Sequence, residues 1–254
     1  NNASFNCNAA KMLITSKQWA QRETFLRLIG RALSQAPTRK AYYPGASERY
    51  NTLTGDRGRL ERYGEATADK LPWTLIRDVD ATRRDEPLFR VEPFCGILSE
   101  TCVGSADPVE FLAAATRFMN ADLWGTLNAC LVVHPKLEHD QTVGKALDRA
   151  IVELRYGTVG INHWPAVGYA VASMPWGGHP SASLRDIQSG LGWVHNTHML
   201  DGIDKSIVRG KLVVKPTPVW FFDNRKAAQL GPKLVAMEAD PSWWKMPGLV
   251  LSAL

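Results

Sequence analysis

The sequence lacks the features that mark membrane, secreted and disulfide-stabilised proteins. Its 254 residues contain no run of eighteen apolar residues, so we expect no membrane-spanning helix. Only four cysteines occur and none forms a CxxC pair, which excludes a disulfide scaffold and argues against a zinc knuckle. Segment 1–10 has neither the basic start nor the apolar core of a secretory signal. We therefore expect a reducing, cytoplasmic setting without a membrane partner. An initiator methionine is also missing, so we expect a processed chain or a piece of a longer one.

A continuous basic stripe is missing too. The 30 Lys and Arg residues exceed the 25 Asp and Glu residues, and the excess lies in residues 1–90, which hold 16 basic and 10 acidic side chains. These basic residues are scattered, without the interleaved aromatic side chains of a single-stranded nucleic-acid site. We expect no nucleic-acid partner, an expectation that steeply salt-dependent binding would contradict.

Apolar residues alternate between strand-like and helix-like spacing, which predicts an α/β fold. Residues 17–35 place apolar side chains at three- and four-residue steps, and Asp107-Pro108 supplies an N-cap and a proline for a first helical turn. Strands are expected at 10–15, 73–77, 94–103, 126–133 and 158–162, and helices at 17–35, near 57–70, from 107 onward and at 141–155. This order is typical of an open, largely parallel sheet flanked by helices, and the apolar segment 126–133 indicates a central strand.

Two prolines mark the strand expected at 211–221. Proline cannot donate a hydrogen bond inside a sheet, so this strand is expected at an edge. An unpaired edge invites a neighbouring chain, which predicts a homo-oligomer formed through 211–221. We therefore expect an α/β domain at 1–210, followed by an oligomerisation strand and a C-terminal tail at 211–254.

Two residues are candidates for chemistry. Cys7 lies in an asparagine-rich stretch, and a thiol reacts as the thiolate, which backbone N–H groups at a turn or a helix start favour. The alternative is an inert, partly exposed cysteine. Glu92 lies between helix-forming and strand-forming segments, where open α/β sheets place their ligand loops, and a carboxylate there is suited to accept hydrogen bonds from a ribose. The alternative is an ordinary loop carboxylate.

Other motifs indicate little. The histidines at 134, 139, 195 and 198 lack acidic or cysteine partners in the sequence, so no metal site is expected. Gly190 and Gly192 lack the rest of a dinucleotide fingerprint, and no phosphate loop of the GxxxxGK type exists.

Four short motifs, in order, resemble the second half of the aldehyde dehydrogenase superfamily over roughly residues 1–180. Asn2 stands five residues before Cys7, as in the family's nucleophile motif, and Glu92-Pro-Phe94 is similar to its Glu-x-Phe-Gly signature. Gly157-Thr-Val-Gly-Ile-Asn162 resembles Gly-Thr-Val-x-(Val/Ile)-Asn, and Pro175-Trp176-Gly-Gly resembles Pro-Phe-Gly-Gly.

The resemblance implies the catalytic domain of an NAD(P)-dependent aldehyde dehydrogenase. Cys7 would attack the aldehyde to give a thiohemiacetal and then a thioester, with its own backbone N–H helping to hold the oxyanion. Glu92 would bind the nicotinamide ribose, and Phe94 would pack beside it. Trp176 and the loop after Asn162 would line the aldehyde tunnel, with Asn162 tying that loop down. NAD or NADP would be bound mainly by a domain absent from this chain, so the chain alone is expected to be inactive.

Departures from the family pattern keep two alternatives open. Ser4 and Phe5 replace the usual Gly and Gln, and Cys95 stands where the family has a glycine after phenylalanine. One alternative is an acylating relative in which coenzyme A resolves the thioester. The other is a non-catalytic α/β domain of the same superfamily that serves in protein interaction.

Overall fold

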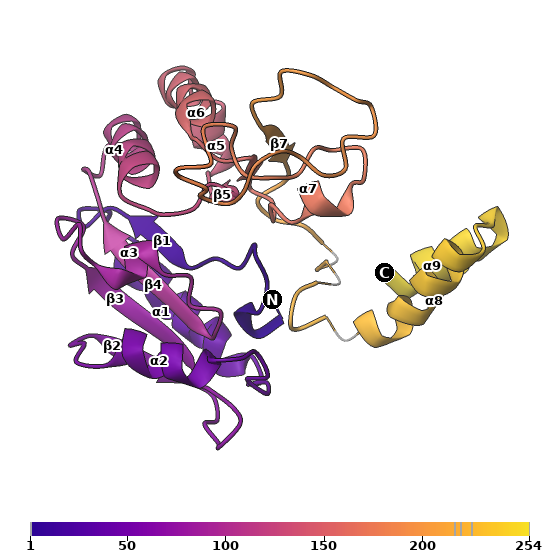
Figure 1. Cartoon of the computed structure of the whole chain (residues 1–254), viewed down its shortest axis with the longest axis horizontal. Helices are drawn as coiled ribbons and strands as arrows, with labels where there is room; N and C mark the ends of the chain where they lie inside the picture. Colours follow the sequence, from indigo (N-terminus) through magenta and orange to yellow (C-terminus); the bar gives the residue numbers. More distant parts are fainter. Residues whose placement is uncertain (1, 216, 219, 225, 254) are drawn as a thin grey trace. The chain divides into compact units, whose positions relative to one another are not determined.

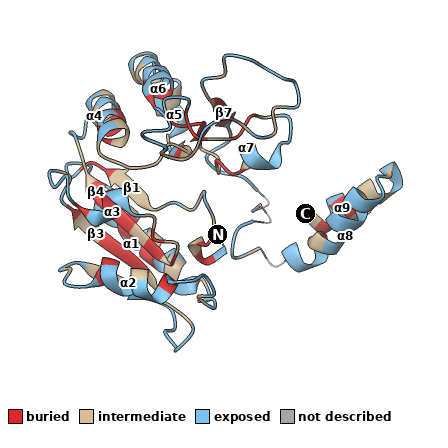
Figure 2. Ribbon diagram, in the orientation of Figure 1, coloured by how far each residue is buried: buried red, intermediate tan, exposed pale blue. Residues whose placement is uncertain are grey.

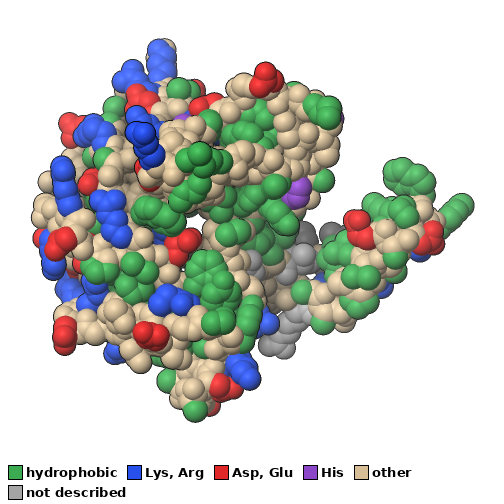
Figure 3. Space-filling view, viewed as in Figure 1, with side chains coloured by type: hydrophobic (Ala, Val, Ile, Leu, Met, Phe, Trp, Pro, Cys, Tyr) green, Lys and Arg blue, Asp and Glu red, His purple; other side chains and the backbone are tan. Residues whose placement is uncertain are grey.

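The computed structural model describes residues 2–215, 217–218, 220–224 and 226–253. The chain separates into two compact units, Asn2–Leu212 and Val213–Leu254 (Figure 1). The larger unit carries both sheets, and buried residues follow their strands (Figure 2). On the face seen in Figure 3, Lys and Arg side chains of this unit are interspersed with acidic and hydrophobic ones rather than aligned.

The first sheet has four strands in the order β1-β4-β3-β2. Their bounds are β1 Met12–Thr15, β2 Leu60–Tyr63, β3 Trp73–Val79 and β4 Ile97–Cys102. Strands β1, β4 and β3 are parallel neighbours, and β2 runs antiparallel to β3. The sheet is therefore mixed, with one antiparallel edge strand.

Helices cover both faces of this sheet. Helix α1 (Arg22–Gln35) lies on one face, where Arg77 of β3 bonds to Glu23. Helix α2 (Ala46–Thr54) lies on the other, where the hydroxyls of Tyr50 and Thr74 are 2.6 Å apart. Because Thr74 and Arg77 are an odd number of positions apart on the strand, their side chains point to opposite faces. The short helix α3 (Pro87–Arg90) contributes Phe89 to the same core as α2.

The second sheet has three parallel strands in the order β5-β6-β7. Its strands are β5 Asn128–Leu131, β6 Thr158–Ile161 and β7 Ser206–Arg209, and its helices are α4 Pro108–Ala121, α5 Pro135–Glu138, α6 Gln141–Glu153 and α7 Val167–Ala170. Asp107 caps α4 as expected, since its carboxylate accepts the N–H groups of Val109 and Glu110. Helices α4 and α6 pack on one another and bury Leu147 and Ile151 against the sheet. The predicted α/β class is confirmed.

Two local expectations in this unit are wrong. Residues 57–70 contain strand β2 rather than a helix. The strand forms because Leu60–Tyr63 pairs with β3 and turns the alternate residues Glu61 and Tyr63 toward α1. The helix of this region lies earlier, at α2. Segment 126–133 is not central: β5 has one neighbouring strand among the described residues, and Cys130 is exposed. The central strand is β6, whose four residues are all buried.

The strand expected at 211–221 is also wrong. The described residues of that range form bends and a turn, and Val213 is 70% exposed. Among the described residues the last strand lies earlier, at β7, where Ser206 and Val208 point inward and the strand pairs with β6. Pro216, which is outside the described residues, and Pro218 both lack the N–H that a sheet requires.

The smaller unit is a helical hairpin. It contains α8 (Ala227–Ala239), the 3-10 turn η2 (Trp243–Lys245) and α9 (Met246–Ala253), with α8 and α9 packed together. Trp243 and Trp244 are largely exposed. Among the described residues, no helix combines the length and apolar character that crossing a membrane requires.

Candidate functional site

Cys7 lies in an exposed turn shortly before β1. The 3-10 turn η1 (Asn2–Ser4) precedes it, and the Phe5 N–H donates to the Asn2 carbonyl at 2.9 Å. Phe5 is buried, whereas the Cys7 thiol is exposed. The phenylalanine therefore anchors the segment and leaves the thiol two residues later open to solvent.

Glu92 and Phe94 lie in the loop between α3 and β4. Arg49 of α2 holds this loop: Nε donates to the Pro93 carbonyl at 2.8 Å, and a terminal nitrogen donates to the Phe94 carbonyl at 3.4 Å. Phe94 has a φ of 43°, in the left-handed region that non-glycine residues rarely adopt. The guanidinium stabilises this backbone by binding two successive carbonyls.

The fold brings these two loops together because both precede neighbouring parallel strands. Met12 of β1 pairs with Ser99 of β4, so the loops meet at the amino ends of the two strands. A small cavity between them is lined by Ser4, Asn6, Ala9, Ala10 and Lys11 from one loop and by Glu92, Pro93, Phe94 and Ile97 from the other. Ligand loops of open α/β sheets are expected at the carboxyl ends of the strands. Glu92 instead lies at the amino ends of β1 and β4, so the expected edge of the sheet is wrong.

A chain of aromatic rings also joins the two loops. Phe5 stacks on Tyr43 with ring centroids 5.8 Å apart, and Tyr43 contacts Phe94 at 5.0 Å. Tyr42 meets the edge of Phe5 at 4.8 Å and is 58% exposed. Tyr42 and Tyr43 were not predicted from the sequence, where the available signal was an aromatic pair within a polar segment.

Lys11, which was not predicted from the sequence either, also lines the cavity. Its Nζ donates to the Trp124 carbonyl at 3.1 Å. Burial lowers the pKa of Lys11, and the Glu92 carboxylate partly offsets that effect by favouring the ammonium form. Among the described residues, nothing donates a hydrogen bond to the Glu92 carboxylate, which leaves it open to a ligand.

Asn162 and Trp176 belong to the second sheet. The Asn162 amide bonds to Val133 twice, donating to its carbonyl at 2.9 Å and accepting its N–H at 2.8 Å, which ties the end of β6 to that of β5. Trp176 is buried, exchanges backbone hydrogen bonds with Val194 and meets the Tyr169 ring at 5.8 Å. Across the described part of the chain, no hydrogen bond or ring contact joins either residue to Cys7.

The glycines after Trp176 allow a close backbone crossing. A Cβ on Gly157 would lie 1.8 Å from the Gly177 carbonyl oxygen, and a Cβ on Gly177 would lie 2.3 Å from the Gly192 carbonyl oxygen. Both contacts are with backbone, which cannot rotate away. Three chain segments therefore cross here at distances that only glycine permits.

His179, which sequence reasoning missed, follows this crossing. Its Nδ1 accepts the Ser181 N–H at 3.2 Å, so Nε2 carries the proton and donates to Asp204 at 3.1 Å. Burial lowers the pKa of His179, and Asp204 opposes that effect. The histidine ties the loop at 179–181 to Asp204, just before β7.

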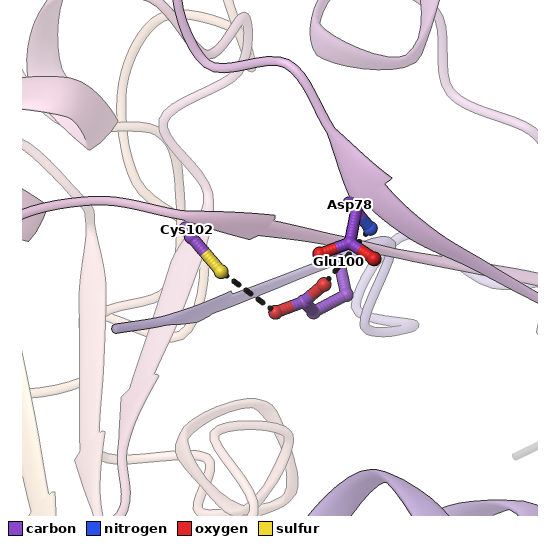
Figure 4. Close-up of side chains that lie close together, drawn as sticks. All are labelled: Asp78, Glu100 and Cys102. Carbon is purple, nitrogen blue, oxygen red and sulfur yellow. Dashed lines mark hydrogen bonds between the residues drawn. The ribbon is translucent and has the colours of Figure 1, made fainter. Parts of the chain in front are cut away.

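One cluster of metal-ligand side chains occurs among the described residues: Asp78, Glu100 and Cys102 (Figure 4). Glu100 is fully buried, but its two oxygens already accept hydrogen bonds from Arg22 at 2.9 and 2.7 Å. The guanidinium thus supplies the positive charge that a metal ion would bring. We interpret the cluster as a buried ion-pair network rather than a metal centre.

Solved structures with a similar fold were found for the larger part of the chain. A glyceraldehyde-3-phosphate dehydrogenase from Methanocaldococcus jannaschii, solved with NADP, matches with a TM-score of 0.54 and 16% identity over 76% of this chain and 39% of its own. Aldehyde dehydrogenase 21 from Physcomitrella patens, solved with succinate, matches with a TM-score of 0.51 and 15% identity, over 69% of this chain and 35% of its own. A variant of Thermus thermophilus 1-pyrroline-5-carboxylate dehydrogenase matches with a TM-score of 0.51 and 20% identity, over 69% of this chain and 33% of its own. The fold is aldehyde dehydrogenase-like.

The chain spans about a third of the length of these solved proteins. No protein-family model matches its sequence, and no curated protein does. The similarity is therefore one of fold, and it agrees with the resemblance carried by the four motifs.

The Glu92 carboxylate suits one part of a nicotinamide cofactor, its ribose, whereas the cavity itself, at about 10 Å³, has the size of a single water molecule. The open Glu92 carboxylate can accept hydrogen bonds from two neighbouring ribose hydroxyls. Asn8 Oδ1 is buried and has no hydrogen-bond partner in the described structure, but Asn8 does not line the cavity. Phe94 adds an apolar wall to the cavity.

Proposed function

We propose that this chain is the catalytic portion of an NAD(P)-dependent aldehyde dehydrogenase with Cys7 as its nucleophile. The observation that carries the proposal is the cavity that joins the Cys7 turn to the Glu92–Phe94 loop. The two motifs are about 85 residues apart in sequence and meet only because β1 and β4 are parallel neighbours. The aldehyde dehydrogenase-like fold supports the same proposal.

The Cys7 thiolate would add to the aldehyde carbonyl and form a thiohemiacetal. No acceptor among the described residues takes the Cys7 backbone N–H, so this N–H is available to the developing oxyanion. The exposed position of the thiol gives a substrate direct access. Trp176 and the loop after Asn162 are proposed to border the aldehyde site, with Asn162 acting through its two bonds to Val133.

NAD or NADP is the proposed cofactor, and when bound it supplies the acceptor for the hydride that leaves the aldehyde carbon. Glu92 is proposed to bind its ribose hydroxyls, and Phe94 to pack beside its ring. Arg49 would hold both residues in position through the Pro93 and Phe94 carbonyls. Most of the cofactor contacts are proposed to come from a domain outside this chain.

The test is nicotinamide reduction with a panel of aldehydes, using the complete protein that carries this chain. We expect Cys7→Ser to abolish activity and Cys130→Ser to retain it. Both residues are exposed, but only Cys7 lies in the turn whose Asn6 lines the cavity, whereas the Cys130 thiol donates to the His163 carbonyl on the second sheet. An increase in rate with coenzyme A would indicate the acylating alternative. A folded, cofactor-binding protein that is inactive in every form would refute the proposal and favour the interaction domain.

A further inference from the structure

A second concave surface lies on the α1 side of the first sheet. It is a groove of about 500 Å³ between α1 and the strands β2 and β3. Its lining consists of Glu23, Arg27, Gly30, Arg31, Ser34, Glu61, Tyr63 and Arg77. None of these residues lines the cavity at Cys7. The volume is within the usual range for small-molecule sites, and the lining is almost entirely polar.

Both carboxylates of the groove are paired with the same arginine. Arg77 donates to Glu23 at 2.6 Å and to Glu61 at 3.0 Å. The Tyr63 hydroxyl also donates to Glu61. Burial and this hydrogen bond raise the pKa of Tyr63 to about 12, so the phenol stays neutral. The lining holds three arginines and two glutamates, so its formal charge is +1, and the remaining arginines, which have no ion pair among the described residues, are Arg27 and Arg31.

Arg27 and Arg31 are those remaining arginines. They are four residues apart on α1, so their guanidinium groups lie on the same side of the helix and repel one another. Within the described structure neither forms an ion pair; Arg27 makes one 3.4 Å hydrogen bond to Thr24 Oγ1. In addition, Arg77 Nε is buried and has no hydrogen-bond partner among the described residues.

Gly30 lies between the two arginines and sets the depth of the groove. A Cβ at Gly30 would lie 2.2 Å from the Tyr63 hydroxyl oxygen, so a larger residue would push the phenol away from the helix. Glycine within a helix lowers its stability relative to alanine. The chain thus keeps a destabilising residue where it lets the Tyr63 hydroxyl approach α1 within the groove that Arg27 and Arg31 also line.

We propose that this groove binds the phosphate group of a small phosphorylated molecule. Guanidinium groups bind phosphate oxygens through paired, charge-assisted hydrogen bonds, and two of them at one site match a dianion. A bound phosphate would remove the repulsion between Arg27 and Arg31. The site is separate from the proposed aldehyde site and does not depend on its chemistry.

The test uses the whole 254-residue chain, titrated with inorganic phosphate and with phenyl phosphate while backbone amide resonances are recorded by NMR. We expect both probes to shift the resonances of Gly30 and Tyr63, and the monoester to bind more tightly because its ring contacts Tyr63. The double variant R27Q/R31Q should weaken binding at least tenfold. R27K/R31K, which keeps the charge but loses the planar fork, should weaken it several-fold.

The matched control is K145Q/R149Q, which removes two exposed cations with the same spacing from α6, and it should bind the probes like the unmodified chain. Equal weakening by both glutamine pairs would show that only net charge matters and would overturn the proposal. So would an absence of resonance shifts up to about 10 mM phosphate, a concentration that detects even millimolar affinity. If a single-stranded oligonucleotide bound through Arg27 and Arg31 much more tightly than phenyl phosphate, the proposal of a small ligand would be wrong and the groove would be a nucleic-acid site.

Discussion

Replacing Arg22 by methionine would leave a carboxylate buried without its cation. Glu100 is fully buried and accepts hydrogen bonds from Arg22 Nε at 2.9 Å, from the second Arg22 nitrogen at 2.7 Å and from the Asp78 N–H at 3.1 Å. Burial by itself raises the pKa of Glu100, but the hydrogen bonds from Arg22, Thr15 and Asp78 outweigh it and hold the pKa below its usual value. The carboxylate is therefore charged because Arg22 is present.

The expected magnitude follows from that burial. Removing one partner of a buried ion pair typically costs about 3–5 kcal/mol. Arg22→Met removes both bonds to Glu100 and also the bonds of 2.7 Å to Asp78 and 3.0 Å to the exposed Glu23. The double variant R22M/E100L should be more stable than R22M, since it leaves no uncompensated charge on Glu100. Arg209→Met is the control: its side chain is 46% exposed, and losing its pairs with Glu138 and Asp148 should cost about 1 kcal/mol or less.

Urea unfolding followed by circular dichroism measures these free energies. The pH dependence gives an independent check. With Arg22 present, the depressed pKa of Glu100 adds stability above pH 4.5, which is lost as the pH falls. Without Arg22, burial raises the pKa of Glu100, so the variant should recover stability on acidification. A loss below about 1 kcal/mol for R22M, or additive effects in the double variant, would refute the ion-pair reasoning.

Two further predictions concern the second sheet. Gly157→Ala should lower the free energy of unfolding by about 3 kcal/mol or more, because the new Cβ meets the Gly177 carbonyl oxygen. The control Gly58→Ala, which has nothing within 4 Å of the new Cβ, should change stability little in the same thermal or urea unfolding. Similar behaviour of the two variants would contradict the close backbone crossing at Gly157. The pKa of His179 is lowered by burial, so stability should be full above pH 6.5 and fall as the pH drops below it. Melting curves from pH 8 to 5 should show a shallower loss for His179→Gln, and an unchanged slope would refute this role.

The predictable parts of the fold are those that local pattern specifies. Helix α4 begins where Asp107 and a proline indicate, and β6 is buried as its apolar residues suggest. The position of β2 was not predictable, since Leu60–Tyr63 is short and polar and becomes a strand only by pairing with β3. Arg22 gave a readable signal: it interrupts the apolar face of α1, and that face buries Arg22, Leu26 and Gly30. Its partner Glu100 lies 78 residues away, which no local pattern reveals.

The candidate site shows the same division between local and long-range information. The motifs singled out Cys7 and Glu92 as candidates, but the meeting of the turn that holds Cys7 with the loop that holds Glu92 depends on β1 and β4 being adjacent and parallel. That adjacency is reinforced by the buried network, in which Arg22 of α1 binds Glu100 of β4 while the Thr15 hydroxyl of β1 donates to the same carboxylate. Loss of Arg22 should therefore loosen β1 against β4, and with it the distance between the two loops that precede these strands. Of the changes considered, R22M is the one outside the cavity that we expect to affect stability and the geometry at Cys7 together.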